Sequence, residues 1–472
     1  MEGQRIPFSF GVEMEFYIAW HLEGHDRPAA PDEFRSHPGG PVTIARQALE
    51  MQFPLAQTAV VRALEQAIAN LPQDDSLPIV TQPDILYNEW LIGSDASLEA
   101  EWPEQLPGDG EELVEAGSGW VGVEIVSPAL WATQRSIEEI RKVCRFLYKT
   151  FWIFTPFQAG LHVHVGTGHA WLPIASLRRM AALLYSADPI LAQMYPPYRI
   201  THFYCPSTRL YATVSFGAKI SEDYLAGVEY QPEDSLPPPS PMKAIMQKIY
   251  EGTRAVFQLP KDAPKPERKR DVNFPPRPTK SALVIQPGTA LESANFHPGM
   301  ERRKLADFAN YRPIPMMDAV SELLRATNRN RLGVLMRVAP GRGAYNCNEF
   351  ITDRKRTIEF RRGAATVDPV QVVSQVRIAV RLCQFAVESS DEAFTNIILD
   401  CAQGEVTPEY FDIYDLLQDL DLYPEARIVQ AVTTNSLNAS IRNQYWLSCG
   451  NPISHEDEED EKDDDVDGVI YI

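Results

Sequence analysis

The stretch FSFGVEMEFYIAW at residues 8–20 alternates between apolar and acidic positions in a way that predicts a β-strand. Its aromatic and β-branched residues favour extended backbone. Because successive side chains of a strand point to opposite faces, Val12 and Met14 share one face. Glu13 and Glu15 share the other face. The apolar face indicates contact with a hydrophobic core. The other face carries two neighbouring carboxylates, which repel each other.

Three later strands repeat this division between an apolar and an ionisable face. The segment GVEIVSP carries Glu124 within an otherwise apolar run. The segment GLHVHVG places His162 and His164 on one face. The segment TIEFRR places Glu359 and Arg361 on one face. A polar strand face is usually just exposed to solvent. Solvated faces are rich in Lys, Thr, Ser and Gln, whereas these four strands carry Glu, His and Arg. Their shared residue types therefore indicate a shared chemistry.

These residue types point to a cation and a phosphate. Glutamate and histidine supply the oxygen and nitrogen donors that bind divalent cations, and arginine suits phosphate. A cation also removes the repulsion between Glu13 and Glu15, because each carboxylate then faces a positive charge. Several acids together with an arginine predict a site for Mg²⁺ and a polyphosphate.

The rest of the chain alternates between short strands and helices. Strands occur in consecutive groups followed by a helix rather than in strict alternation, which favours an α+β fold with an antiparallel sheet and helices on one side. Three helices are predicted over residues 55–71, 173–195 and 316–328. Two more are predicted from their N-terminal signals, one at a capping box of Ser136 and Glu139 and one at Asp368 and Pro369. Further short strands are predicted within PIVTQ, YNEWLIGS and AYNCNEFI.

Composition bounds the size and class of the protein. A chain of 472 residues with 44% hydrophobic and 10% aromatic content has the material of an ordinary soluble globular protein. We expect one elaborated catalytic domain over residues 1–450, with inserts at about 21–50 and 231–313. The second insert is rich in proline and basic residues, which is typical of a flexible surface segment, or alternatively of a lid that brings positive charge to an anionic ligand. Residues 451–472 are predicted to form an acidic, disordered tail.

Charge and cysteine usage exclude several classes of protein. The net charge of −20 argues against a nucleic-acid surface, because phosphate contacts need a basic field. Residues 455–472 hold ten acids and one lysine, so they supply −9 of this charge and leave −11 for the rest. The six cysteines are scattered without a CxxC pair, which is typical of reduced thiols. Without a basic leader or an apolar run of about 18 residues, we expect a cytoplasmic protein that does not contact a membrane.

Four segments, FGVEMEF, GVEIVSP, GLHVHVG and RTIEFRRGAATVDP, resemble in order and spacing the putative amidoligase family. This family belongs to the carboxylate–amine ligases with a glutamine synthetase-like fold, a superfamily that also includes the glutamate–cysteine ligases. Smaller similarities lie in WLIGSDASL, in RITHFYCP and in YNCNEF. In RITHFYCP, His202 stands where the family usually has asparagine. The matching segments run from about residue 8 to 390 and leave out both inserts and the tail.

The resemblance implies a fold and a set of ligands. The fold is an antiparallel sheet curved into a funnel with helices on its outer face, where ATP and Mg²⁺ enter at one end and the acid and amine substrates at the other. The implied metal ligands are Glu13, Glu15, Glu124, Glu359 and His162. Either His162 or His164 is implied to complete the metal or to contact the phosphates.

The resemblance also implies catalytic and cofactor-binding roles. Arg361 neutralises the γ-phosphoryl group during its transfer, beside Glu359. Arg199 holds a phosphate or a substrate carboxylate. Asp95, within WLIGSDASL, is a further cofactor-binding position.

The activity that follows is an ATP- and Mg-dependent carboxylate–amine ligase, which forms an amide through an acyl phosphate. Such catalysis needs positioning and charge neutralisation rather than a protein nucleophile, and the chain has neither a GxSxG elbow nor a Walker A loop. The expected partners are a small-molecule or peptide carboxylate and an amine. Three other hypotheses stay open: a metal-dependent hydrolase, a non-catalytic nucleotide-binding protein on the same scaffold, and a phosphotransferase similar to the guanidino kinases.

Overall fold

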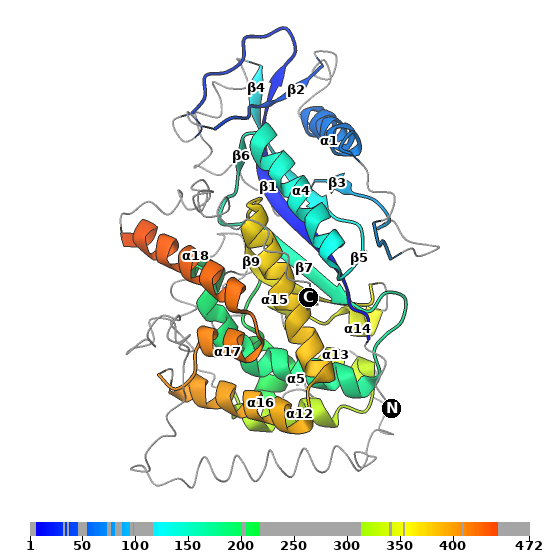
Figure 1. Cartoon of the computed structure of the whole chain (residues 1–472), viewed down its shortest axis with the longest axis vertical. Helices are drawn as coiled ribbons and strands as arrows, with labels where there is room; N and C mark the ends of the chain where they lie inside the picture. Colours follow the sequence, from blue (N-terminus) through cyan, green and yellow to red (C-terminus); the bar gives the residue numbers. More distant parts are fainter. Residues whose placement is uncertain are drawn as a thin grey trace, which may run out of the picture. The chain divides into compact units, whose positions relative to one another are not determined.

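The computed structural model (Figure 1) describes the greater part of the chain. The described residues are 6–31, 34, 37–45, 54–72, 77–80, 87–94, 98, 117–200, 202, 204–217, 313–338, 342–352, 355–407 and 409–441. Asp95, the acidic tail and almost all of the insert predicted at 231–313 lie outside these residues.

Contacts along the chain divide it into two compact units. Unit 1 comprises Met1–Ile6, Val165–Arg362 and Ile378–Gln430, and unit 2 comprises Pro7–His164, Gly363–Arg377 and Ala431–Ile472. Two strands and two helices begin in one unit and end in the other. The expectation of a single domain over residues 1–450 stays a prediction.

Within the described residues, nine strands form one open sheet, with the order β3-β4-β1-β7-β9-β8 and with β2, β5 and β6 paired to β1. The strands are β1 (Ser9–Leu22), β2 (Val42–Ile44), β3 (Leu91–Gly93), β4 (Ser118–Val126), β5 (Leu130–Trp131), β6 (Ile153–Phe154), β7 (Gly160–Gly166), β8 (Tyr345–Asn346) and β9 (Thr357–Ala364). The pairs β1–β4, β3–β4 and β8–β9 are antiparallel, and β2 runs parallel to β1. Together with the helices, this large antiparallel sheet confirms the predicted α+β class with a curved sheet.

The strand β1 is buried on both faces. Val12 and Met14 on the apolar face are 0% and 1% exposed, whereas Glu13 and Glu15 on the other face are 8% and 5% exposed. The alternation predicted from the sequence is therefore correct, but the acidic face is not a solvated one. Burial of two carboxylates requires partners for them, since an uncompensated buried charge costs several kcal/mol.

Unit 2 covers the apolar face of β1 with helix α4 (Gln134–Thr150), which runs along the strand in Figure 1. The Cys144 Sγ atom of this helix lies 3.7 Å from the Met14 Sδ atom of β1. The helix begins two residues before the predicted Ser136, because Thr133 is the N-cap and its side chain accepts the Ser136 N–H. The capping-box prediction at Ser136 and Glu139 is thus wrong. A further helix of this unit, α1 (Pro54–Ala69), agrees with the predicted 55–71.

Unit 1 is mainly helical around α5 (Ile174–Leu191), which packs against α12 and α16. Its other helical segments are η3 (Ala192–Met194), α6 (Pro197–Ile200), α7 (Thr208–Tyr211), η4 (Thr213–Phe216), α12 (Met316–Arg325), α13 (Arg329–Met336), α14 (Glu349–Thr352), α16 (Asp391–Val406) and α17 (Ile413–Asp419). The helix predicted at 316–328 ends at Arg325, since Asn328 caps the next helix by accepting the Arg331 N–H. The strand predicted over AYNCNEFI covers only two residues, because a helical turn begins at Glu349.

Two helices, α15 (Pro369–Glu388) and α18 (Tyr423–Ile441), start in one unit and end in the other. Asp368 caps α15 as predicted, because its Oδ1 atom accepts the N–H groups of Val370 and Gln371. Among the described helices, α15 is the one long and apolar enough to cross a membrane, yet 61% of its apolar window is buried inside the protein. Core helices of soluble proteins have the same length and composition.

The close approach of β7 and β9 within unit 2 gives a test of the sheet. A Cβ atom on Gly363 would lie 2.4 Å from the Leu161 carbonyl oxygen, whereas nothing lies within 4 Å of a Cβ atom on Gly93. We expect Gly363→Ala to lower the free energy of unfolding by about 1–3 kcal/mol through overpacking, and Gly93→Ala to change it by less than about 0.5 kcal/mol. Urea denaturation of both variants checks this. Equal stabilities would mean that the two strands are not paired at Leu161.

Candidate functional site

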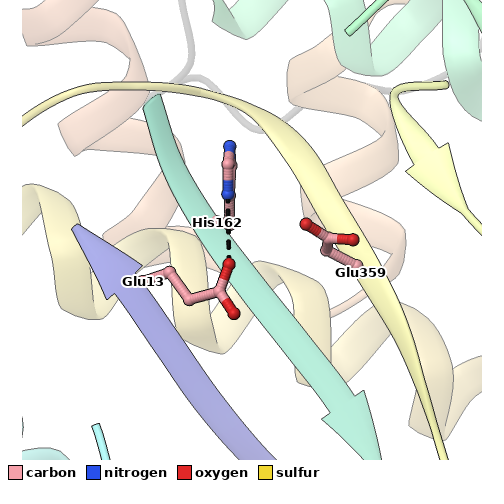
Figure 2. A group of neighbouring side chains, drawn as sticks. All are labelled: Glu13, His162 and Glu359. Atoms are coloured by element: carbon pink, nitrogen blue, oxygen red, sulfur yellow. Dashed lines mark hydrogen bonds and ion pairs between the residues drawn. The ribbon is translucent and has the colours of Figure 1, made fainter. Parts of the chain in front are cut away.

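Five ionisable side chains gather on the inner face of the sheet in unit 2, and we call them the acid–histidine cluster: Glu13, Glu15, Glu124, His162 and His164. Glu15 lies directly opposite Glu124 in the pairing of β1 with β4. The Nε2 atom of His164 lies 2.9 Å from one carboxylate oxygen of Glu13. The Nδ1 atom of His162 lies 3.3 Å from the other oxygen of Glu13 (Figure 2) and 3.4 Å from Glu15.

The carboxylates of β1 are held from two sides. Glu15 accepts a hydrogen bond of 2.7 Å from the backbone N–H of Gly160 as well as facing His162. Four of the five residues are less than a tenth exposed, and Glu124 is half-buried. Their orientations are therefore fixed by contacts before any ligand arrives, which favours binding because little further ordering is needed.

The donor set of this cluster fits a divalent cation. Glu15, Glu124 and His162 each offer a ligand atom, and the three atoms lie within 4.8 Å of one another. Two carboxylates with one imidazole suit Mg²⁺ or a first-row transition metal rather than a soft ion. Glu13 borders His162 and His164, so it adds a further anionic oxygen beside these donors.

A second group of polar side chains lies on β8 and β9 in unit 1. Asn346 faces Glu359 in the strand register and donates its amide to the Glu359 carboxylate at 2.6 Å. The side-chain Oδ1 atom of Asn346 accepts the Asn348 N–H at 3.0 Å, which fixes the orientation of the side-chain amide. Arg361 forms an ion pair with Glu359 through its Nη1 atom. The structure thus brings Glu359 and Arg361 together on one face of β9, as the sequence predicts.

Arg199 supports the backbone of β9. Its guanidinium donates to the carbonyl oxygen of Arg361 at 2.9 Å and lies 3.5 Å from that of Arg362. The side chain is 1% exposed. These contacts are those of a structural arginine, so the role of Arg199 in holding a phosphate or a substrate carboxylate stays a prediction.

The opposite face of β9 carries a fully buried ion pair that the sequence does not reveal. The Nη1 atom of Arg362 lies 2.6 Å from the Asp188 carboxylate of α5. Asp188 also accepts hydrogen bonds from the Ser207 hydroxyl at 2.5 Å and from the Arg209 N–H at 3.0 Å. Burial lowers the pKa of Arg362, but the charge of Asp188, together with the neighbouring Tyr345, Cys205 and Tyr195, outweighs this effect and the pKa is raised. The one signal in the sequence is a single acid in the mostly apolar second half of α5, MAALLYSADPIL.

Tyr204 and His202 lie beside Arg361 in unit 1. The Arg361 Nε atom donates to the Tyr204 carbonyl oxygen at 3.4 Å. The Tyr204 N–H donates to the His202 Nδ1 atom at 3.3 Å. Burial, and then the positive charges of Arg199 and Arg361, hold the pKa of His202 well below its usual value. His202 is therefore neutral at physiological pH.

An aromatic cluster continues the inner face of unit 2 beyond the acids. Tyr17, two positions after Glu15 on β1, donates its hydroxyl to the Leu98 carbonyl oxygen, and burial raises its pKa to about 12. The rings of Trp120 and Phe34 lie 5.6 Å apart between their centroids. Tyr17, Phe34, Leu98 and Trp120 belong to one buried cluster of unit 2.

The comparisons with known proteins agree with the resemblance in the sequence. The family model described as putative amidoligase enzyme matches residues 7–213, which include β1, β4 and β7 with the acid–histidine cluster. The match supports an enzyme of the ligase class. The comparison with curated proteins and the comparison with solved structures each gave no match.

The buried pair of Arg362 and Asp188 predicts a large effect on stability. Arg362→Gln leaves the Asp188 charge buried without its cation, so we expect the free energy of unfolding to fall by about 3–5 kcal/mol. The matched control is Arg381→Gln, since Arg381 lies 3.5 Å from the Asp421 carboxylate, which is 79% exposed. That variant is expected to lose about 1 kcal/mol or less. Similar losses in both variants, measured by urea denaturation, would contradict the structural role of Arg362.

Proposed function

We propose that this chain, which belongs over residues 7–213 to the putative amidoligase family, is an ATP- and Mg-dependent carboxylate–amine ligase. It joins a small-molecule or peptide carboxylate to an amine in the cytoplasm. The observation that carries the proposal is the acid–histidine cluster, in which three potential ligand atoms from β1, β4 and β7 lie within 4.8 Å of one another on a buried sheet face.

The reaction explains why such a site is needed. A carboxylate does not react with an amine at neutral pH, because its leaving group would be oxide. Transfer of the γ-phosphoryl group of ATP to the carboxylate gives an acyl phosphate and ADP. The amine then attacks the acyl carbon, phosphate leaves, and the amine loses a proton to give the amide. Both steps depend on neutralising phosphate charge and on positioning, rather than on a protein nucleophile.

The residues proposed to hold Mg²⁺ are Glu13, Glu15, Glu124, His162 and Glu359. Bound there, Mg²⁺ supplies positive charge to the phosphate oxygens of the nucleotide. The support for Glu359 is its buried carboxylate on β9, which follows β7 in the strand order of the sheet. His164, paired with Glu13 at 2.9 Å, is proposed to orient that carboxylate or to contact the phosphates.

Arg361 is proposed to neutralise the γ-phosphoryl group during its transfer. Its ion pair with Glu359 and its contact with the Tyr204 carbonyl oxygen fix the guanidinium by two of its nitrogen atoms. A guanidinium that is fixed in advance stabilises charge that develops during the reaction without reorganising. Arg362 is not a candidate for this role, because its partner is Asp188 on the opposite face of β9.

The first test measures binding of Mg·ATP through the melting temperature. A ligand that binds only the native state adds RT ln(1 + [L]/Kd), which is about 2.7 kcal/mol at a hundredfold excess over Kd. We expect Mg·ATP to raise the melting temperature and EDTA to abolish this rise. Glu15→Gln should lose most of the rise, because a hard cation loses an anionic ligand. Glu23→Gln, a change at an exposed position just after β1, should keep it.

The activity is then tested by ATP-dependent phosphate release over a panel of amino acids, peptides and amines with Mg²⁺ present. At least one pair of acid and amine should raise phosphate release above background, with amide formed in equal amount. Binding of Mg·ATP without release for any pair would favour a nucleotide-binding protein. Phosphate-independent cleavage of an amide would favour a hydrolase. Absence of both binding and release would overturn the proposed function.

The role of Arg361 predicts a separation between catalysis and stability. Arg361→Lys keeps the charge but loses the planar pair of donors, so we expect kcat to fall by about 10²- to 10³-fold, as for removal of one preorganised oxyanion donor. KM should change much less, because the charge shifts most in the transition state. Arg362→Lys serves as the control. We expect its melting temperature to fall, while the kcat of its folded fraction stays close to that of the wild type. A crippled kcat in Arg362→Lys with a normal Arg361→Lys would contradict the assignment.

A further inference from the structure

Asn346 of β8 holds the Glu359 carboxylate of β9 from the neighbouring strand. The two residues lie directly opposite each other in the antiparallel pairing, and each is 5% exposed. The Nδ2 atom of Asn346 donates a hydrogen bond of 2.6 Å to the Oε2 atom of Glu359. Arg361 pairs through its Nη1 atom with the other carboxylate oxygen, Oε1. The carboxylate is therefore held by a neutral donor on one oxygen and by a guanidinium on the other.

The side-chain amide of Asn346 is fixed by the turn that follows β8. Its Oδ1 atom accepts the backbone N–H of Asn348, two residues further on, at 3.0 Å. This is the contact of an Asx-turn. Because a backbone N–H can only donate, the contact requires the amide oxygen, and the amide nitrogen is left to face Glu359. The direction of this donor is thus set by the local backbone.

We propose that Asn346 is a positioning residue, which holds Glu359 in the orientation in which its carboxylate binds a divalent cation. The inference rests on the proposed function, in which Glu359 is a ligand of Mg²⁺. Hydrogen bonds from neighbouring residues orient the carboxylates that bind metals, and losing one typically costs about 10- to 100-fold in metal affinity. A neutral amide suits this task, because it restrains the carboxylate without cancelling the negative charge that attracts the cation.

The alternative is that Asn346 only stabilises the fold as a partner of a buried carboxylate. Ser207 is a matched control for that role, since its hydroxyl also donates to a buried carboxylate, that of Asp188, at 2.5 Å. The Ser207 oxygen also accepts a backbone N–H, that of Leu210, at 3.2 Å. Substitution of either residue by alanine therefore removes one donor to a carboxylate and one acceptor for a backbone N–H. Of the two, Asn346 is the one that contacts a residue proposed to hold Mg²⁺.

The experiment measures the dissociation constant of Mg·ATP by calorimetry and the melting temperature of each free variant of the full chain. Asn346→Ala and Ser207→Ala are both expected to lower the melting temperature, because each loses two hydrogen bonds. Asn346→Ala should weaken binding of Mg·ATP by about 10- to 100-fold, while Ser207→Ala should stay within about threefold of the wild type.

Two further variants separate the orientation of Glu359 from general damage to the fold. Asn346→Ser keeps an acceptor for the Asn348 N–H, as serine does in the corresponding turn, but is too short to reach Glu359. It should bind Mg·ATP as weakly as Asn346→Ala, with a smaller loss in melting temperature. In the background of Glu359→Gln, which itself should bind more weakly, Asn346→Ala should cause no further loss. A residue that acts through Glu359 gives such non-additive effects.

The other outcomes overturn the inference. If Asn346→Ala binds Mg·ATP no more weakly than Ser207→Ala, Asn346 has only a structural role. A full further loss in the Glu359→Gln background would show that Asn346 acts independently of Glu359, and normal binding by Glu359→Gln would remove the ligand that Asn346 is proposed to orient. In all three cases the wild-type chain still binds Mg·ATP. A wild-type chain that does not bind it would instead overturn the proposed function, so the two failures are distinguishable.

Discussion

The repulsion between carboxylates buried on one sheet face is the constraint on which the arrangement of the site depends. Glu13 and Glu15 lie side by side on β1 with less than a tenth of their surface exposed. In a medium of low dielectric constant such charges are unstable without partners. The strand β7 supplies these partners, because His162 and His164 contact Glu13, and the Gly160 N–H binds Glu15. The HxH spacing of β7 places both imidazole rings on the same face of the strand, where they contact Glu13.

In unit 1, buried charges on both faces of strand β9 also have partners of opposite charge. On one face Glu359 is held by Asn346 and Arg361, and on the other Arg362 is held by Asp188. A shift of the strand register by one residue would exchange the two faces, and it would separate Glu359 from Asn346 and Arg362 from Asp188. The pairs Arg362–Asp188 and Asn346–Glu359 therefore favour the observed register of β9, and with it the direction in which Glu359 and Arg361 point.

The sequence predicts those parts of the site that depend on local periodicity. The face of Glu13, the face of His162 and the face of Glu359 follow from the alternation of side chains along a strand, which is set by neighbouring residues. The partner of Arg362 could not be predicted, because Asp188 lies 174 positions away and helix periodicity does not show which strand an acid meets. The N-cap of α4 is Thr133, three residues before the predicted Ser136, since both residues are good N-caps and the structure uses the first.

The contacts of the acid–histidine cluster also bear on how a cation would enter it. Because imidazole and backbone N–H groups already compensate the carboxylates, a cation must replace part of these contacts, and the net gain in free energy is smaller than for bare carboxylates. Mg²⁺ moreover keeps several water molecules and prefers one or two carboxylates together with the phosphates of its substrate. Under the proposed function, both considerations favour a cation that would arrive with the nucleotide and leave with the product over one that is permanently bound. Under the proposed function, such a site would reach its full affinity for the cation only together with the phosphate oxygens of the nucleotide.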